Sequence, residues 1–395
     1  MEIILMQNAL SVMDHAHLCP SNAQRNWLKK AKTSYEKQEI ENAKSNKKQL
    51  WDVIKEICGC KKQSDYSSSL LTSNNPQTDI NQVNLSFANI GAKLAEKIPS
   101  SKRTSSHFLT EDSQATPIDS FAIIPADESE ILSLIKGLKN KCAVGVDQIS
   151  SKIIKRYANV LVPPITHICN LAISSGVFPS DFKTAIIKPI HKGGGKDCVN
   201  NYRPISILPA LSKVLERLLN QRLIKFLESK ALLSPAQFGF RNGRSTNDAV
   251  HELVDAIVSN LDVKKKCITV FLDLAKAFDT VSIPHLLKKL SRLGIRGLPL
   301  KLMEEYLTDR KQRVRINNII SDEMSVHFGV PQGSIMGPTL FLAYINDLCQ
   351  LPLHLAASLC TFFFERAVDA VSLVIFERLN KRKLWKDVKD EFKKD

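Results

Sequence analysis

The chain has 395 residues, 44% of them hydrophobic, and it carries a net charge of +15 at pH 7. This length allows two or three domains with a sizeable core, and the hydrophobic fraction is ordinary for a globular protein. No apolar run approaches the roughly 20 residues of a membrane span, which argues against a membrane protein. The excess of Lys and Arg indicates a polyanionic partner, nucleic acid before a membrane surface, although a solvated basic surface would give the same excess.

The cysteines indicate a reducing environment. There are nine of them, an odd and scattered set without zinc-finger spacing. The first 30 residues lack the basic start, apolar core and small-residue cleavage site of a secretory signal. We therefore expect an intracellular protein, in the nucleus or the cytoplasm.

The first 120 residues are predicted to form an extension ahead of the main domain. Residues 21–62 are rich in Lys, Asn, Gln and Glu, with apolar residues at helical spacing, and residues 1–62 are predicted to form a helical, basic linker. Residues 63–120 are dominated by Ser, Thr, Asn, Gln and Asp. They predict a polar, partly disordered linker with one helix near residues 83–98.

Beyond residue 120, helix signals follow one another in the chain. Asp127 and Glu130 form a capping-box pattern ahead of apolar residues that share one helix face. A Pro-Pro pair at residues 163–164 predicts the start of a second helix, which Gly176 ends. Residues 211–227 repeat apolar residues, mainly leucines, at the helical period and predict a helix.

Strand signals are fewer and lie in the second half. Residues 267–273 form an apolar, β-branched run that predicts a buried strand, and Asp279 is predicted to cap the helix after it. "RVRIN" and "MSVHF", joined by a turn-rich link, predict a hairpin. Residues 371–376 predict a further strand. Helices interspersed with a few strands indicate the α+β class.

The buried strand ends on Asp273, which makes this carboxylate a candidate metal ligand. A carboxylate at such a position needs a partner that offsets its desolvation, and a metal ion would supply it. Two-metal nucleotidyl transfer requires oxygen ligands of this kind on a rigid platform. The alternative is an aspartate that caps the next helix, which an isolated aspartate would favour.

A glycine-rich turn follows about fifty residues later. In "GVPQGSIMGPTLF", Gly329, Gly333 and Gly337 surround the amide side chain of Gln332. Glycines permit a positive φ angle and a close approach of the backbone. Gln332 could then hydrogen-bond a sugar or a base edge.

Two basic stretches complete the pattern. Lys188 and Arg203 flank one loop, where converging cations would suit a triphosphate. In "QFGFRNGRST", Arg241 and Arg244 alternate with aromatic residues, an arrangement suited to backbone phosphates and stacking. A turn whose Ser245 caps the next helix is an alternative that fits the same letters.

In this order, "NYRPISIL", "QFGFRNGRST", "FLDLAKAFD", "GVPQGSIMGPTLF" and "YINDL" resemble the reverse transcriptase domain of non-long-terminal-repeat retrotransposons of the jockey-like, insect type. The resemblance covers roughly residues 120–350. It implies a right-hand polymerase with fingers and a ferredoxin-like palm over residues 121–377, a basic helix or tail over 378–395, and no thumb.

The resemblance also implies roles for individual residues. Asp273 would bind Mg²⁺ as the first catalytic carboxylate, and Phe278 would exclude a ribose 2′-hydroxyl. Gln332 and Gly333 would line the incoming nucleotide. The remaining positions are Lys188 and Arg203, which would face the triphosphate, and Arg241 and Arg244, which would contact the template. RNA template, DNA primer and dNTPs are the implied partners.

One part of the family's pattern is not found in this sequence. The family completes its metal site with an Asp-Asp turn, and the chain contains no Asp-Asp pair. The best register puts Val368 in the first position and leaves Asp369 as the second catalytic aspartate. We therefore expect a truncated, degenerate and inactive copy. A non-catalytic nucleic-acid-binding remnant and a poorly folded, unselected product are the alternatives.

Overall fold

The computed structural model describes residues 22–44, 67–97, 119–140, 143–264, 269–272, 276–350, 360–363 and 371–376, with a few single positions between 46 and 54 and at 274. The chain divides into two compact units, Met1–Asp65 and Tyr66–Asp395. In the first unit the structure describes one long helix, α2 (Asn22–Ala43). This helix falls within the segment for which a helical linker was predicted.

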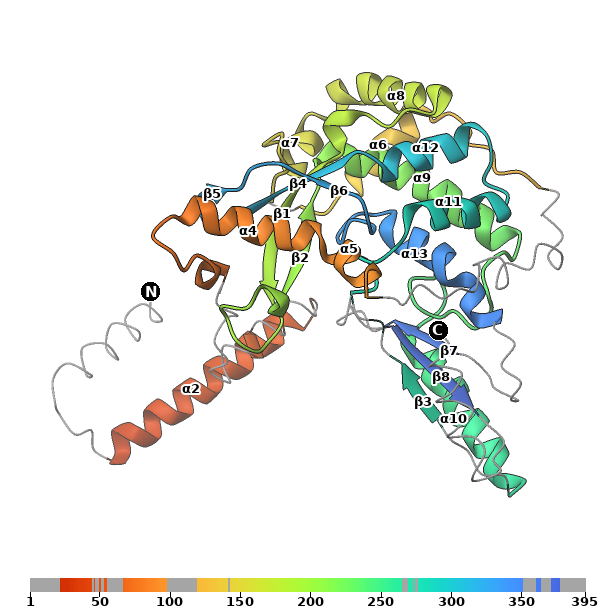
Figure 1. Cartoon of the computed structure of the whole chain (residues 1–395). Helices are drawn as coiled ribbons and strands as arrows, with labels where there is room; N and C mark the ends of the chain where they lie inside the picture. Colours follow the sequence, from red (N-terminus) through yellow and green to blue (C-terminus); the bar gives the residue numbers. More distant parts are fainter. Residues whose placement is uncertain are drawn as a thin grey trace. The chain divides into compact units, whose positions relative to one another are not determined.

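The second unit is mainly helical (Figure 1). Its described α-helices are α4 (Pro76–Ala88), α5 (Ile90–Ala95), α6 (Glu128–Lys136), α7 (Ser151–Arg156), α8 (Ala158–Ser175), α9 (Ala210–Ser229), α10 (Thr246–Asp262), α11 (Ile283–Arg292), α12 (Leu298–Leu307) and α13 (Gly337–Ile345). Short 3-10 turns lie at η1 (Ser67–Leu70), η2 (Ser180–Phe182), η3 (Val199–Asn201) and η4 (Asn346–Gln350). None of the helices in the described part of the chain is long and apolar enough to cross a bilayer.

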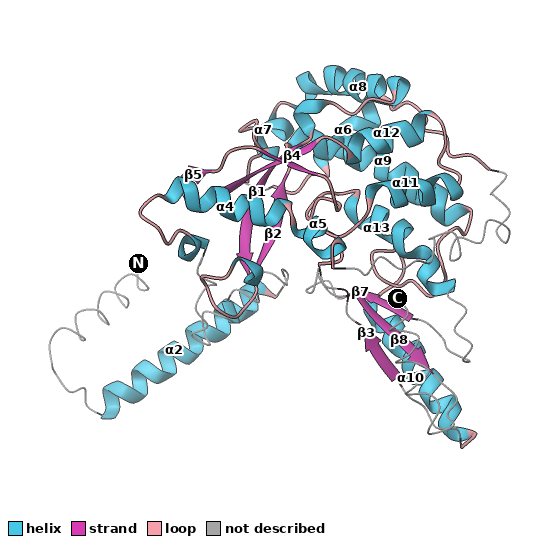
Figure 2. Cartoon of the chain, viewed as in Figure 1, coloured by secondary structure: helices cyan, strands magenta, loops and turns pink. Residues whose placement is uncertain are grey.

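The strands form two separate sheets (Figure 2). The strands are β1 (Thr184–His191), β2 (Tyr202–Ile207), β3 (Thr269–Leu272), β4 (Arg310–Ile316), β5 (Ile319–Ile320), β6 (Met324–Val326), β7 (Cys360–Phe363) and β8 (Val371–Phe376). The first sheet has the order β2-β1-β4-β5, with β6 also paired to β4, and only its β1–β4 pair is parallel. The second has the order β3-β8-β7 and is antiparallel. Helices combined with small sheets of mixed direction agree with the predicted α+β class.

The long helix α9 lies at the centre of the main hydrophobic core. Its leucines Leu215, Leu218, Leu219 and Leu223 are fully buried among residues of α6, α8, α11, α12 and α13. This confirms the prediction of a helix over residues 211–227. Burial of each such side chain contributes about 1.5–3 kcal/mol, so α9 is a main source of stability.

Local signals predicted one helix start correctly and another incorrectly. Asp127 caps α6 by accepting the N–H of Glu130 at 2.8 Å, as predicted. Helix α8, however, begins at Ala158 and contains Pro163 and Pro164 in its interior. These prolines leave the carbonyls of residues 159 and 160 without their usual donors. Both residues are exposed, so water can bind the carbonyls and the helix continues.

The hairpin and the last strand are confirmed. Strand β4 pairs with β5 and β6 along one edge, through Arg315 with Ile320 and Arg310 with Val326. A two-residue turn joins β4 to β5, and Asn317 there has a φ of 53°, as tight hairpin turns require. Residues 371–376 form β8, as predicted.

The segment predicted as a polar linker over residues 63–120 is structured in part. Helix α4 packs on the first sheet, where Ile80, Val83 and Phe87 join a second hydrophobic cluster with Val314 of β4. Asn84 adds polar contacts to the same face of the helix, because its amide donates to the carbonyl of Asp322 at 2.9 Å. Residues 67–97 are therefore part of the second unit.

This packing gives a stability prediction. Ile80→Ala is expected to destabilise the second unit by about 3 kcal/mol, because Ile80 is fully buried and its removal leaves a cavity. Leu85→Ala, in the same helix at 47% exposure, is the matched control and should cost less than about 1 kcal/mol. Urea unfolding of the full chain measures both. Equal, small losses would mean that α4 is not held on the sheet.

Candidate functional site

The two predicted catalytic aspartates, Asp273 and Asp369, lie outside the described residues, but the strands beside them are described. Leu272, the last residue of β3, pairs with Leu373 of β8, and Val371 of β8 pairs with Phe363 of β7. The C-terminal end of β3 and the N-terminal end of β8 therefore lie at the same end of this sheet. The catalytic roles of both aspartates remain predictions.

The turn after β3 is tied to the glycine-rich loop. Backbone N–H groups of Gly329 and Val330 donate to the carbonyls of Val281 and Phe278, at 2.8 and 2.9 Å. The Phe278 ring is buried and stacks on Phe341 of α13, with ring centroids 4.8 Å apart. The position predicted to exclude a ribose hydroxyl is thus fixed by packing, immediately beside the loop that carries Gln332.

The predicted helix cap nearby is wrong. Helix α11 begins at Ile283 with Ser282 at its N-cap, and Asp279 lies four residues before the first helical residue. The reason is Pro284 in the first turn, since proline is favoured there and its missing N–H is not needed. Asp279 instead lines a pocket beside the glycine-rich loop.

Gln332 and Gly333 are pressed against β2 of the first sheet. The N–H of Ser206 donates to the Gln332 carbonyl at 2.7 Å. Gly333 has a φ of 109°, and a Cβ atom there would lie 2.8 Å from the Ser206 carbonyl oxygen. Glycine is required at this position for both reasons. The loop therefore connects the turn after β3 with the sheet formed by β1, β2 and β4.

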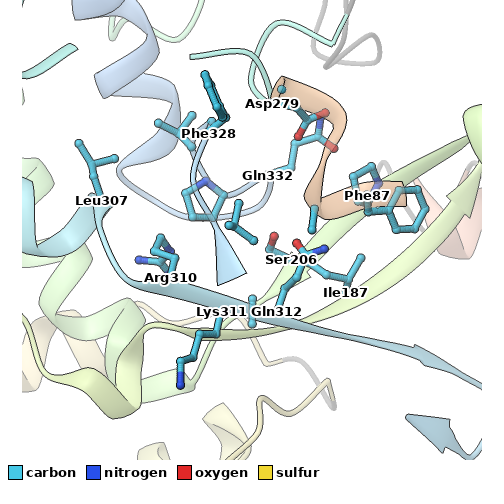
Figure 3. Close-up of a pocket in the computed structure, with 18 residues that line it drawn as sticks. Phe87, Ile187, Ser206, Asp279, Leu307, Arg310, Lys311, Gln312, Phe328 and Gln332 are labelled. Atoms are coloured by element: carbon cyan, nitrogen blue, oxygen red, sulfur yellow. The ribbon is translucent and has the colours of Figure 1, made fainter. Parts of the chain in front are cut away.

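The side chain of Gln332 is buried and lines a small pocket (Figure 3). Further polar lining comes from Ser206, Arg310 and Gln312, and apolar lining from residues that include Phe87 and Phe328. The cavity volume is about 50 Å³. By this measure one water molecule needs about 10–15 Å³, so the pocket has room for a few water molecules or a small ion.

Lys188 and Arg203 lie together on the other face of the same sheet. Lys188 pairs with Ile205, and Arg203 with Ile190, so the two cations are diagonal neighbours across β1 and β2. Successive side chains alternate between the faces of a strand, which places them opposite the side that holds Ser206 and the pocket. The structure thus brings Lys188 to Arg203, but it does not bring either of them into the Gln332 pocket.

Arg241 and Arg244 lie in a loop before α10 rather than on a strand. The guanidinium of Arg241 is bound to both carboxylate oxygens of Glu228, at 2.9 and 2.6 Å, and to the carbonyl of Ser234 at 2.7 Å. Arg244 donates to the Pro235 carbonyl and lies 5.2 Å from the centre of the Phe238 ring. The internal partners of Arg241 give it a role in fixing this loop, and template contact remains a prediction for both arginines.

The cap that follows this loop is confirmed. Ser245 accepts the N–H of Asp248, and the Asp248 side chain accepts the N–H of Ser245, which together form a capping box at the start of α10. The two interpretations of "QFGFRNGRST" are therefore compatible, since the serine ends the loop while the arginines lie within it.

Sequence reasoning missed one buried residue of the site, Glu216 of α9. Its side chain is fully buried, accepts the N–H of Ile335 in the glycine-rich loop at 2.7 Å and accepts the Ser212 hydroxyl at 3.0 Å. Burial raises the pKa of this carboxyl, and the positive charge of Arg310 opposes the rise. The signal was present, because Glu216 falls on the same helix face as Leu219 and Leu223.

The described residues do not include a metal centre. No group of three or more His, Cys, Asp or Glu side chains within them could hold a metal ion. The predicted ligand, Asp273, is outside this part of the chain. The residues that the structure describes can therefore support the loop and the sheet around the predicted centre, and they do not themselves provide its ligands.

Comparisons with known proteins agree with the resemblance in the sequence. Residues 190–364 match the family model described as "Reverse transcriptase (RNA-dependent DNA polymerase)". Over 322 residues the chain is 33% identical to a Drosophila melanogaster protein named "Probable RNA-directed DNA polymerase from transposon X-element", which covers 79% of this chain and 34% of that protein.

Two further relatives from Drosophila melanogaster are similar to this chain. It is 36% identical to the "Probable RNA-directed DNA polymerase from transposon BS" over 62% of the chain and 28% of that protein. It is 34% identical to the "RNA-directed DNA polymerase from mobile element jockey" over 55% of the chain and 24% of that protein. The chain thus spans about a third or less of the length of these relatives.

A second family model matches the end of the chain. Residues 355–392 match the model described as "Cytochrome b-c1 complex subunit 9". The first match ends at residue 364, so Val368 and Asp369 lie only within the second. The register that makes Asp369 a catalytic residue thus lies beyond the first match.

Proposed function

Because residues 190–364 belong to the reverse transcriptase family, we propose that this segment is the nucleic-acid- and nucleotide-binding part of an RNA-directed DNA polymerase from a non-long-terminal-repeat retrotransposon. The family match, together with relatives 33–36% identical, is the observation that carries the proposal. The reaction of such an enzyme is the attack of a primer 3′-hydroxyl on a dNTP, with RNA as the template and a divalent metal.

In the proposed arrangement, the described residues hold parts of the site in place. The glycine-rich loop would present Gln332 to the nucleotide, supported by Phe278 on one side and by Glu216 on the other. Lys188 and Arg203 would meet phosphate from their shared face of the sheet. Asp273 would be the first Mg²⁺ ligand, as its place after β3 suggests.

We propose that the chain as given does not extend primers. The sequence contains no Asp-Asp pair. In the best register, Val368 takes the place of the first aspartate of that pair and Asp369 takes the place of the second. A two-metal site needs its full set of oxygen ligands in the right geometry, and most of the rate is lost without one of them. Binding of RNA and nucleotide does not depend on that ligand and should remain.

A second candidate concerns the end of the chain alone. Residues 355–392 match the subunit 9 model, which favours a segment of separate origin joined to the polymerase part between residues 355 and 364, where the two matches overlap. The pairing of β8 with β3 favours the other interpretation, in which these residues continue the palm. The two interpretations differ in what would restore activity.

Primer extension on an RNA template with Mg²⁺ tests both proposals. The chain as given should show no extension. Replacement of residues 351–395 by the corresponding segment of the jockey protein should give extension, which Asp273→Ala should abolish in the same chimera. Activity of the unaltered chain that Asp273→Ala removes would contradict the proposed inactivity, and an inactive chimera that folds would contradict the polymerase proposal.

The variant Val368→Asp of the unaltered chain separates the two origins of the C-terminal segment. If this segment is a palm that has lost one aspartate, the single substitution should restore extension. If the segment has a separate origin, Val368→Asp should stay inactive, and only the chimera with the jockey segment should extend primers. We expect the second result, because the reverse transcriptase match stops at residue 364, before this position.

A further inference from the structure

Helix α5 presses its backbone against the candidate site at Gly91, which is buried. A Cβ atom at Gly91 would collide with the Cβ of Phe328 and would lie 2.5 Å from the carbonyl oxygen of Asp279. Gly91 lies within a helix, so glycine is needed here for space rather than for an unusual φ angle. These three residues also line the pocket that holds Gln332 (Figure 3). The close approach joins α5 to the turn after β3 and to the residue before the glycine-rich loop.

The carbonyl of Asp279 lies where α5 and the glycine-rich loop meet. A Cβ atom at Gly329 would lie 3.0 Å from this same oxygen and 2.8 Å from the carbonyl oxygen of Phe278. The N–H groups of Gly329 and Val330 donate to carbonyls of the turn and fasten the loop to it. Because the three segments meet through backbone atoms, a shift of α5 must be taken up by the turn, by the loop or by both.

Helix α4 fixes α5 on the first sheet. Only Asn89 separates the two helices, and its carbonyl accepts the N–H of Lys93 in α5 at 3.0 Å. The amide of Gln312 in β4 donates to the side-chain oxygen of Asn84 in α4 at 2.9 Å. Ile90, the first residue of α5, packs against the hydrophobic cluster that α4 forms with the sheet. The two helices are therefore held on the sheet together.

We propose that α4 and α5, residues 76–95, are a positioning element for the candidate site, in which Gly91 holds the turn that carries Phe278 and, through it, the glycine-rich loop. Phe278 is the residue predicted to exclude a ribose 2′-hydroxyl. The element therefore contributes to the discrimination between deoxyribonucleotides and ribonucleotides, a consequence that rests on the proposed function, whereas the positioning itself does not. Residues 76–95 lie well before residues 190–364, which match the reverse transcriptase model.

Hydrogen exchange of the full chain, measured by mass spectrometry, tests the positioning. In Gly91→Ala the new methyl group meets the Cβ of Phe328 and the backbone of Asp279, which cannot swing aside as the end of a long side chain could. The amides of Gly329 and Val330, which are bonded to the turn, should then exchange about tenfold faster, because the overpacking is relieved by local opening. Unchanged exchange at these amides in a folded Gly91→Ala chain would overturn the proposal.

Gly294→Ala is the matched control for a general loss of stability. A Cβ atom there would lie 2.6 Å from the carbonyl oxygen of Asp119, and the backbone has a φ of 92°. The atoms nearest to it belong to Asp119 and Phe226, outside the glycine-rich loop. This variant should speed exchange around Asp119 and leave Gly329 and Val330 as they are in the unaltered chain. Equal acceleration of these two amides in both variants would contradict a specific role for α5.

A milder pair of variants decides the question if Gly91→Ala does not fold. Ile90 of α5 and Ile319 of β5 are both half-buried against the same hydrophobic cluster. Ile90→Ala loosens α5 without a clash and should speed exchange at Gly329 and Val330 about threefold, whereas Ile319→Ala should leave it unchanged. Equal effects of the two substitutions on these amides would count against the proposal.

Primer extension by the jockey chimera tests the consequence for the sugar. Ile90→Ala in the chimera should lower the ratio of kcat/KM for dCTP to kcat/KM for CTP about threefold, because the Phe278 turn is held less firmly. A loss of stability alone lowers both values together and leaves their ratio unchanged, so an unchanged ratio would overturn the role in discrimination. If the chimera without Ile90→Ala does not extend primers, the proposed function is contradicted, and the exchange results alone decide whether α4 and α5 position the loop.

Discussion

Gly333→Ala is expected to destabilise the second unit by about 4 kcal/mol. The backbone at Gly333 has a φ of 109°, and a Cβ there would lie 2.8 Å from the Ser206 carbonyl oxygen. Strained backbone costs about 1–3 kcal/mol for a residue other than glycine, and forced overpacking costs a similar amount. The clash is with the backbone of β2, which cannot move away as the end of a flexible side chain could. Urea unfolding of the full chain measures the loss.

Gly243→Ala is the matched control for this prediction. Gly243 also has a positive φ, 74°, but a Cβ there would have nothing within 4 Å. It should therefore show only the conformational cost, about 1 kcal/mol. If the two variants lost the same stability, the glycine-rich loop would be free to move away from β2. The link from the Phe278 turn through Gln332 to the sheet would then not be rigid.

Most features that depend on neighbouring residues in the chain were predictable from the sequence, although the helix start at Pro163 and the cap at Asp279 were predicted wrongly. The cap of α6 at Asp127, the capping box at Ser245 and the leucine period of α9 each need only a few consecutive turns of helix. The β4 hairpin likewise follows from a short link between two strand-like stretches. In each case the pattern and the structure that satisfies it lie within about twenty residues.

Features that depend on tertiary packing were not predictable. The start of helix α4 was difficult to predict because the helix lies in a polar stretch of sequence. Its buried residues are Ile80, Val83 and Phe87, with Asn84 beside them. Buried asparagine is unusual, and the sequence does not show that it bonds with Gln312 of β4 at 2.9 Å. The sequence therefore predicted a helix only from about residue 83, whereas α4 begins at Pro76 and α5 ends at Ala95.

The candidate site shows the same division. The motifs predicted Gln332, Lys188 and Arg203 as members of one site, and this assignment stays a prediction, with Lys188 just before the matched residues 190–364. Their placement on opposite faces of the β1–β2 pair depends on strand register, which the sequence does not reveal.

Glu216→Ala is the second substitution with a large expected effect, about 4 kcal/mol of lost stability. It would leave the N–H of Ile335 buried without its acceptor, which costs about 1–3 kcal/mol. It would also remove the negative charge near Arg310, whose side chain is itself buried. Truncation of this fully buried side chain to alanine also leaves a cavity, which typically costs about 2–5 kcal/mol. These costs overlap, because the same rearrangement of the loop can relieve both.

Glu216→Gln separates the hydrogen bond from the charge. The amide oxygen of glutamine can still accept from Ile335, so this variant should recover most of the stability that Glu216→Ala loses. A Glu216→Gln variant as unstable as Glu216→Ala would mean that the charge near Arg310, rather than the hydrogen bond to the loop, is what the fold requires.

The unaltered chain and Glu216→Gln also test the protonation of the Glu216 carboxyl group, through the pH dependence of their unfolding free energies. Burial raises the pKa of Glu216 in the folded chain above its unfolded value, so the folded state binds the proton more tightly. Its contribution to stability is therefore complete below the unfolded pKa and is lost as the pH rises through the folded pKa. Glutamine does not titrate, and the stability of Glu216→Gln should fall less over this interval. Parallel pH profiles for the two proteins would show that Glu216 titrates as it does in the unfolded chain, which would contradict its burial against the glycine-rich loop.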